Sequence, residues 1–224
     1  MLAGNRNFAL SNGHGMMGGK FSCGERFSVK MIQRVCVFCG SNRGSRPSYA
    51  QAATLLARHL AANGIGLVYG GGNVGLMGVL ADEALSSGTE VIGVIPQSLV
   101  EREVAHLGLS ELRIVASMHE RKAQMAELCD AFIALPGGFG TLEEFCEVLT
   151  WAQLGLHRKP CGLLNVEGYF DRLLELFDHA VAEGFLKPAH RRIVISETCP
   201  VSLVRRLSEY EPPATEKWIN RKQT

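Results

Sequence analysis

The chain has 224 residues, of which 46% are hydrophobic and 20% are charged. This balance is typical of a folded globular protein and excludes an intrinsically disordered chain. The formal net charge is +1, and basic residues are in excess at both ends, so the central segment is slightly acidic. Such a domain is a poor candidate for binding a nucleic-acid polymer, because a basic surface provides most of that affinity. No apolar stretch is long enough to predict a transmembrane helix or a membrane partner.

The two ends of the chain differ in composition from its centre. Residues 1–33 include the run NGHGMMGGK and are predicted to be a disordered leader or extension, with a weak transit peptide as the alternative. Residues 34–210 are predicted to form one nucleotide-binding α/β domain, and residues 211–224 a loose tail. Cys36 and Cys39 lie in a predicted strand, where residues three apart face opposite sides. We therefore expect buried, reduced thiols and a cytoplasmic location.

Strand and helix patterns alternate along the chain. Continuous apolar runs predict strands over 34–39, 65–69, 90–95, 112–116, 131–136, 160–165 and 192–196. Helices are predicted from the N-cap Ser45 to Gly64 and over 74–87, 117–129, 142–155, 169–184 and 201–210, with helical character over 98–110. Ser117 and Glu120 have the spacing of a capping box. Strands without polar alternation are typical of a parallel sheet covered on both faces. The sequence therefore predicts a single Rossmann-like, doubly wound α/β domain with a mainly parallel sheet flanked by helices.

Three predicted strands end in glycine loops that lead into helices. These loops are Cys39-Gly40-Ser41, Gly70-Gly71-Gly72 and the run from Pro136 to Thr141. Ligands of open parallel sheets bind beyond the carboxyl ends of the strands, where free N–H groups of helix N-termini hold anions. One such loop is equally compatible with tight packing, but three together favour a nucleotide or a sugar phosphate. Neither the dinucleotide fingerprint nor a P-loop lysine is matched, and no histidine motif predicts a metal.

Two charged positions near these loops each have two interpretations. Arg121 and Lys122 lie near the first turn of the helix that Ser117 begins, where cations oppose the helix dipole. They either serve an anionic ligand or belong to a solvated face. Glu144 either closes a capping box with Thr141 or acts as a catalytic carboxylate. An Arg–Glu pair beside a sugar phosphate suits N-glycosidic cleavage, because a carboxylate stabilises an oxocarbenium-like transition state and orients water.

Several longer motifs occur together over roughly residues 34–207. The most specific is PGGFGTLEE at 136–144, preceded by MHERK at 118–122; VCVFCGS, VYGGGNVGLMG, VIGVIP and TWAQLGLHRKPCGLLN accompany them. With these segments the chain resembles the LOG ("lonely guy") family of cytokinin riboside 5′-monophosphate phosphoribohydrolases, many of which were once labelled lysine decarboxylase-like. Family members are usually homodimers with the site near the interface, and the helix bearing Glu144 is a candidate contributor.

The resemblance implies a set of site residues and no cofactor. Arg121 and Glu144 would be the catalytic pair. The residues expected to hold the phosphate and ribose are Gly71, Gly72, Gly138, Gly140 and Thr141, and those expected to line the nucleotide site are Ser41, Met118 and Lys122. Arg121 would support either the leaving base or the hydroxyls of the substrate.

The expected reaction is hydrolysis of N6-substituted AMP, and of AMP itself, to the free base and ribose 5-phosphate. The alternative is a non-catalytic nucleotide-binding or carrier protein on the same scaffold, because one fold hosts many functions. A carrier would need the glycine loops but not the charged pair, so the presence of both Arg121 and Glu144 favours the enzyme.

Overall fold

A computed structural model describes residues 31–100 and 105–213. Within these residues, seven strands form one sheet in the order β4-β3-β2-β1-β5-β6-β7, and every pairing is parallel. The strands are β1 (Arg34–Phe38), β2 (Gly66–Tyr69), β3 (Val91–Pro96), β4 (Glu111–Val115), β5 (Ala131–Ala134), β6 (Cys161–Leu164) and β7 (Val194–Glu197). This topology confirms the predicted doubly wound α/β fold.

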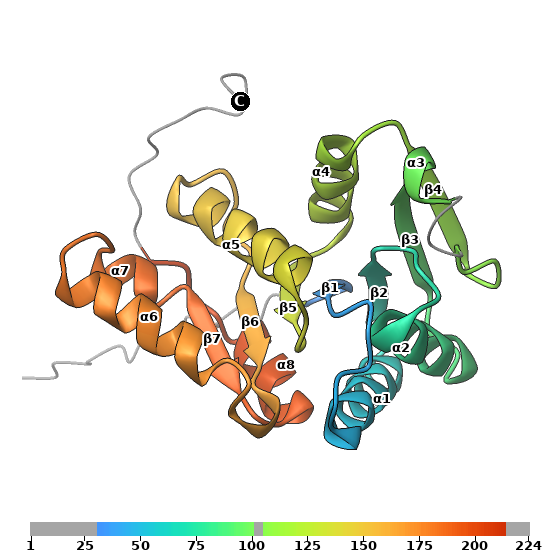
Figure 1. Cartoon of the computed structure of the whole chain (residues 1–224), viewed down its shortest axis with the longest axis horizontal. Coiled ribbons are helices and arrows are strands. Elements are labelled where there is room, and N and C mark those ends of the chain that lie inside the picture. Colours follow the sequence, from blue (N-terminus) through green and yellow to red (C-terminus); the bar gives the residue numbers. More distant parts are fainter. Residues whose placement is uncertain (1–30, 101–104, 214–224) are drawn as a thin grey trace, which may run out of the picture.

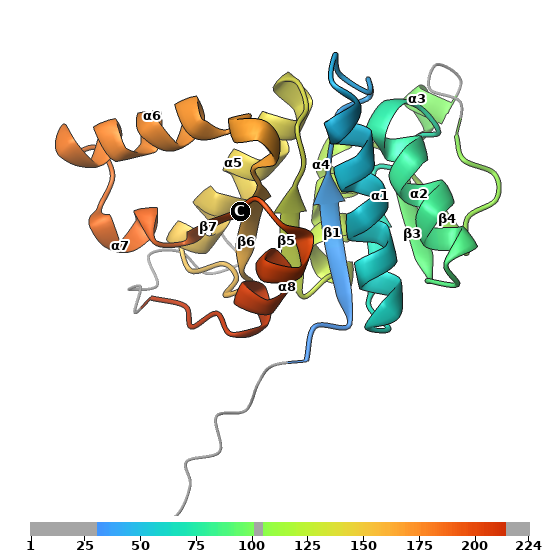
Figure 2. The same ribbon diagram turned by 90° about the horizontal axis from the view of Figure 1, so that it is seen from below.

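Helices cover both faces of the sheet (Figures 1 and 2). One face carries α1 (Pro47–Ala62), α2 (Gly75–Ser86) and α8 (Pro200–Ser208), and the other carries α4 (Met118–Leu128), α5 (Phe139–Gln153) and α6 (Asp171–Ala182). The shorter elements are α3 (Gln97–Val100), the 3-10 turn η1 (Val166–Gly168) and α7 (Pro188–Arg191). Because helices pack on both sides, the central strands β1, β2 and β5 are buried on both faces, which explains their continuous apolar sequences.

The chain changes direction across the sheet between β1 and β5. From β1 it builds outward through β2, β3 and β4, and then returns to add β5 on the other side of β1. This is the switch point at which open α/β sheets bind ligands, beyond the carboxyl ends of the two strands. The loops that follow β1 and β5 are joined there, because the N–H of Gly40 donates to the carbonyl of Pro136 at 3.1 Å. The N–H of Leu76, in α2, donates in turn to the carbonyl of Gly40 at 3.0 Å.

The helix boundaries confirm some local expectations and correct others. Ser117 is the N-cap of α4, and its side chain accepts from the N–H of Glu120 at 3.1 Å. The N-cap of α1 is Arg46, so the prediction of Ser45 was wrong. No side-chain capping bond forms there, and Pro47, as the first helical residue, lowers by one the number of N–H groups that the helix start leaves without a partner.

The α5 boundary matters most for the site. This helix begins at Phe139 with Gly138 as its N-cap, which is earlier than the predicted start at residue 142. Thr141 therefore lies inside the first turn and cannot cap the helix, so the capping-box interpretation of Glu144 is wrong.

Other segments differ in detail or lie outside the described residues. The predicted helical character over 98–110 is confined to α3, residues 101–104 are not described, and residues 106–110 have no regular secondary structure. Of the predicted leader only residues 31–33 are described, and of the tail only 211–213. No helix in the described ranges is both long and apolar enough to cross a membrane.

Candidate active site

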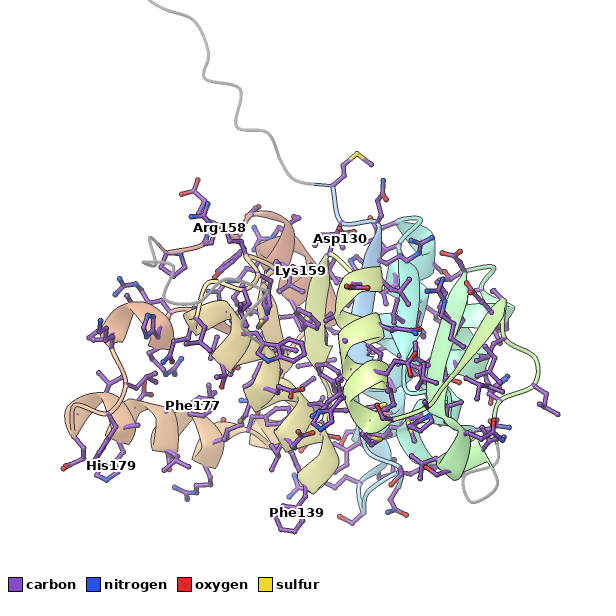
Figure 3. The ribbon with its side chains drawn as sticks, turned by 90° about the horizontal axis from the view of Figure 1, so that it is seen from above. Asp130, Phe139, Arg158, Lys159, Phe177 and His179 are labelled. Atoms are coloured by element: carbon purple, nitrogen blue, oxygen red, sulfur yellow. The ribbon has the colours of Figure 1, made fainter. Side chains whose placement is uncertain are left out.

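A cavity of about 280 Å³ opens at the switch point. Its walls come from the end of β1 and the loop after it, from α4, and from the first turns of α5. The lining includes Cys39, Gly40, Ser41, Gly70, Met77, Leu99, Met118, Arg121, Gly138, Phe139, Gly140, Thr141 and Glu144. Figure 3 shows Phe139 projecting from this edge of the molecule, with Asp130, Arg158 and Lys159 at the opposite edge. The cavity therefore lies where the strand ends predicted it.

A buried ion pair forms the floor of this cavity. Arg121 of α4 and Glu144 of α5 are only 8% and 9% exposed, and Nη1 of the arginine contacts Oε1 of the carboxylate. The Nε of Arg121 donates to the carbonyl of Val94 at 3.0 Å, which fixes the plane of the guanidinium. A Cβ on Gly70 would overlap the Nη2 of Arg121, so only glycine leaves space for the guanidinium there. Helix packing thus joins two charges that are 23 positions apart in the sequence.

The environment of Glu144 shifts its protonation equilibrium. Burial raises the pKa of this carboxyl above its ordinary value, and the neighbouring Arg121 opposes the shift. Glu143 adds a further raising influence, because a second negative charge nearby disfavours ionisation. Perturbed carboxyls of this kind in a cleft are typical of catalytic sites.

The N-terminus of α5 supplies an anion-binding surface next to the pair. Its N-cap, Gly138, has no side-chain capping bond, and no acidic residue occupies the first turn. The first N–H groups of the helix are therefore available for an anion, and the helix dipole favours one. Gly137 permits the loop to pack tightly, since a Cβ there would come within 2.7 Å of the Cβ of Thr141 and 2.8 Å of the nitrogen of Gly40.

Three residues expected in the site lie beside the cavity rather than on its wall. Gly71 accepts from the N–H of His106 at 3.1 Å, and Gly72 forms a bridge to Ala105. Lys122 lines a neighbouring hollow between α4 and α5, where it pairs with Glu147 at 3.0 Å, and it also pairs at 2.7 Å with Glu143, which lines the cavity. The structure therefore brings together seven of the predicted residues: Ser41, Met118, Arg121, Gly138, Gly140, Thr141 and Glu144.

Apolar members of the cavity wall were not identified from the sequence. Met77 and Leu99 belong to helices whose residue patterns look like ordinary packing, so nothing local marks them as ligand contacts. Gly70 was part of a recognised loop, but its particular role depends on the position of Arg121, which only the packed helices define.

The fold and the site together define a Rossmann-like α/β protein with a buried Arg–Glu pair beside an anion-binding helix N-terminus. Solved structures of the same architecture include a molybdenum cofactor binding protein from Rippkaea orientalis (TM-score 0.61, 21% identity, 80% of this chain and 98% of that chain). Another is the molybdenum cofactor carrier protein from Chlamydomonas reinhardtii (TM-score 0.60, 18% identity, 80% and 100%). At these identities the likeness establishes the fold alone.

Sequence relatives identify the family. Residues 77–207 match a protein-family profile described as "Possible lysine decarboxylase". The Arabidopsis thaliana protein named cytokinin riboside 5′-monophosphate phosphoribohydrolase LOG7 is 55% identical over 185 residues, covering 83% of this chain and 85% of that protein. The Oryza sativa subsp. japonica protein of the same enzyme name, LOG, is 54% identical over 189 residues, covering 84% and 77%. The chain belongs to the LOG family.

Proposed function

We propose that the protein hydrolyses the N-glycosidic bond of cytokinin riboside 5′-monophosphates, which are N6-substituted forms of AMP, and of AMP itself. The products are the free base and ribose 5-phosphate. The observation that carries this proposal is the buried Arg121–Glu144 pair beside the uncapped N-terminus of α5. The two family relatives described above are 55% and 54% identical in sequence to this chain, and both are named as phosphoribohydrolases of this substrate class, which supports the same reaction.

In this mechanism the α5 N-terminus holds the 5′-phosphate. The N–H groups of the first turn bind the phosphate oxygens, and the hydroxyl of Thr141 stands in the same turn. Anchoring the phosphate holds the ribose next to the carboxylate of Glu144, so that the reacting groups are already oriented when the bond breaks. A nucleoside without the phosphate lacks this anchor, so the proposal requires a phosphate-dependent reaction.

Glu144 acts on the sugar while Arg121 acts on Glu144. As the bond between C1′ and the base breaks, its electron pair leaves with the base and positive charge develops on the ribose ring. The carboxylate of Glu144 stabilises that charge and orients a water molecule toward C1′. The water oxygen bonds to C1′, and the proton it loses passes to Glu144 and then, directly or through solvent, to the base, which leaves protonated and returns Glu144 to its ionised form. Arg121 keeps the buried carboxylate ionised and oriented, because it opposes the effect of burial on the pKa of Glu144. The remaining N–H groups of Arg121 are available to the leaving base or to the ribose hydroxyls.

The experiment is chromatography of reactions with AMP and with isopentenyladenosine monophosphate, each run beside its dephosphorylated nucleoside. Release of free base from the monophosphates alone is the expected result. Release from neither monophosphate, with tight binding of both in a parallel titration, would favour a non-catalytic carrier instead. The carrier proteins among the structural neighbours share only the fold with this chain, so they add no weight to that alternative.

We further propose that the protein is a homodimer formed through the outer faces of α5 and α6. Helix α6 has no buried residue although it carries an apolar stripe, and Leu176 and Phe185 are 58% and 89% exposed. An apolar groove between these elements is lined by Leu149 of α5 and by Phe177 and Phe185. Sedimentation analysis of the wild type and of Phe185→Asp tests this: a dimer is expected for the former and a monomer for the latter.

A cytoplasmic location is also proposed. All six cysteines within the described ranges are free thiols, which is compatible with a reducing compartment.

A further inference from the structure

The connection from β6 to α6 contacts the backbone of the loop between β5 and α5 (residues 135–138), which we call the phosphate loop. Tyr169, in this connection, donates its hydroxyl hydrogen to the carbonyl of Gly137 at 2.6 Å. The ring of Tyr169 packs edge-on against Tyr49 of α1, with centroids 5.8 Å apart. Tyr169 is not among the residues that line the cavity, and its hydroxyl is bonded to the backbone of the loop.

The segment that carries Tyr169 is held in an unusual conformation. Glu167 has φ 55°, a left-handed value that costs a non-glycine residue roughly 1–2 kcal/mol. Its carboxylate pairs with Arg46 at 3.1 Å. The side chain of Asn165 accepts from the N–H of Phe170 and donates to Asp171, both at 2.7 Å. Backbone strain that the surroundings hold in place is typical of functional segments.

The geometry of the peptide unit connects this contact to phosphate binding. No cis peptide bond occurs among the described residues, and in a trans peptide the C=O and the following N–H point in opposite directions. Because the carbonyl of Gly137 points toward Tyr169, the N–H of Gly138 points away from it. Gly138 lines the cavity and Tyr169 does not. Two successive glycines leave this peptide free to rotate unless an outside bond holds it.

We infer that Tyr169 is a positioning residue, whose hydroxyl fixes the Gly137–Gly138 peptide so that the N–H of Gly138 faces the 5′-phosphate. This inference rests on the proposed function for the identity of the anion. Without the hydroxyl, the peptide samples orientations in which that N–H is turned from the phosphate. The consequence is specific: ligands with a phosphate lose affinity, and ligands without one do not.

The test compares Tyr169→Phe with wild type by calorimetric titration of ribose 5-phosphate and, separately, of adenine. We expect ribose 5-phosphate to bind about tenfold more weakly to the variant, which corresponds to losing one charge-assisted hydrogen bond. Adenine affinity should be unchanged, and the melting temperature should fall by no more than about 5 °C, as for the loss of one hydrogen bond. In turnover, KM for AMP should rise more than kcat falls. Tyr49→Phe is the matched control, because among the described residues its hydroxyl has no hydrogen-bond partner while its ring contacts the ring of Tyr169.

Each outcome is decisive. Equal binding of ribose 5-phosphate by Tyr169→Phe and wild type would overturn the inference and leave the proposed reaction untouched. Equal weakening of adenine and ribose 5-phosphate would also overturn it, because a general structural role would affect both ligands. Failure of the wild type to bind ribose 5-phosphate at all would instead contradict the proposed function, on which the assignment of the anion depends.

Discussion

The substitution Glu144→Gln isolates the charge of the buried carboxylate from its shape. The glutamine carbonyl can still accept from the Nη1 of Arg121, so the contact between α4 and α5 is kept while the negative charge is lost. Stabilisation of a cationic sugar and activation of water both require that charge. Removing one preorganised electrostatic group or one general base each lowers kcat by about 10²–10⁴-fold. We expect a loss of that size, with nucleotide affinity within a few-fold of wild type.

The same substitution has a limited effect on folding. Arg121 remains buried and keeps its bond to the carbonyl of Val94, but its charge is no longer neutralised. A weakened charge-assisted hydrogen bond costs about 1–3 kcal/mol, or roughly 3–10 °C in melting temperature for a chain of this size. The variant should therefore be folded at 25 °C, and calorimetric binding of AMP measures the retained affinity.

The assay compares single-turnover release of base by wild type, Glu144→Gln and the control Glu90→Gln. Glu90 directly precedes β3, at the opposite end of the strands from the cavity, and pairs with Arg34, so its substitution removes a charge away from the site. The control should match wild type. A folded Glu144→Gln variant that retained wild-type turnover would refute the assignment of Glu144. A parallel loss of binding, turnover and folding would show that the residue serves structure alone.

Three further predictions follow from the same geometry. Arg121→Ala should lower kcat by about 100-fold and raise the pKa of Glu144 further, because the positive charge that opposes the effect of burial is removed. The pH–rate profiles of the wild type and the variant measure both effects, and an unchanged rate would remove Arg121 from the mechanism. Gly70→Ala should displace the guanidinium of Arg121 and lower kcat/KM by about 100-fold, as measured by steady-state kinetics with AMP. Activity close to wild type would show that a methyl group at position 70 is tolerated beside the guanidinium. In wild type, activity needs ionised Glu144, so kcat/KM should fall as pH drops through a pKa above the ordinary value of about 4.3, and an acid limb at or below that value would contradict the effect of burial.

The fold was largely predictable because the apolar runs that indicate strands alternate with segments that have the residue pattern of helices. Strand β5 is short and wholly apolar, and β1 is apolar after its first residue, Arg34; such runs between helical patterns are compatible with few arrangements other than a covered parallel sheet. Helix starts were less predictable. The spacing of Thr141 and Glu144 satisfies a capping box, but α5 begins three residues earlier, with Gly138 as its N-cap directly after the crowded Gly137.

The site was predictable where motifs dictate it and less so where packing does. Arg121 and Lys122 are adjacent in the sequence, yet successive residues on a helix point about 100° apart. Arg121 consequently lines the cavity, while Lys122 lines the neighbouring hollow and pairs with Glu143 and Glu147. In the same way, Gly70 lies on the cavity wall and Gly71, with φ +78°, turns the chain away from it.

The burial of the Arg121–Glu144 pair suits the proposed reaction but lowers the stability of the folded protein. Withdrawing two charges from water carries a desolvation penalty that their mutual attraction only partly offsets, and apolar residues of similar volume often make a protein more stable by about 1–4 kcal/mol. We therefore expect the double substitution Arg121→Met and Glu144→Leu to match or exceed the wild type in melting temperature while abolishing base release. Thermal stability alone would not favour this pair, so under the proposed function the stability that it costs is offset by its contribution to the reaction.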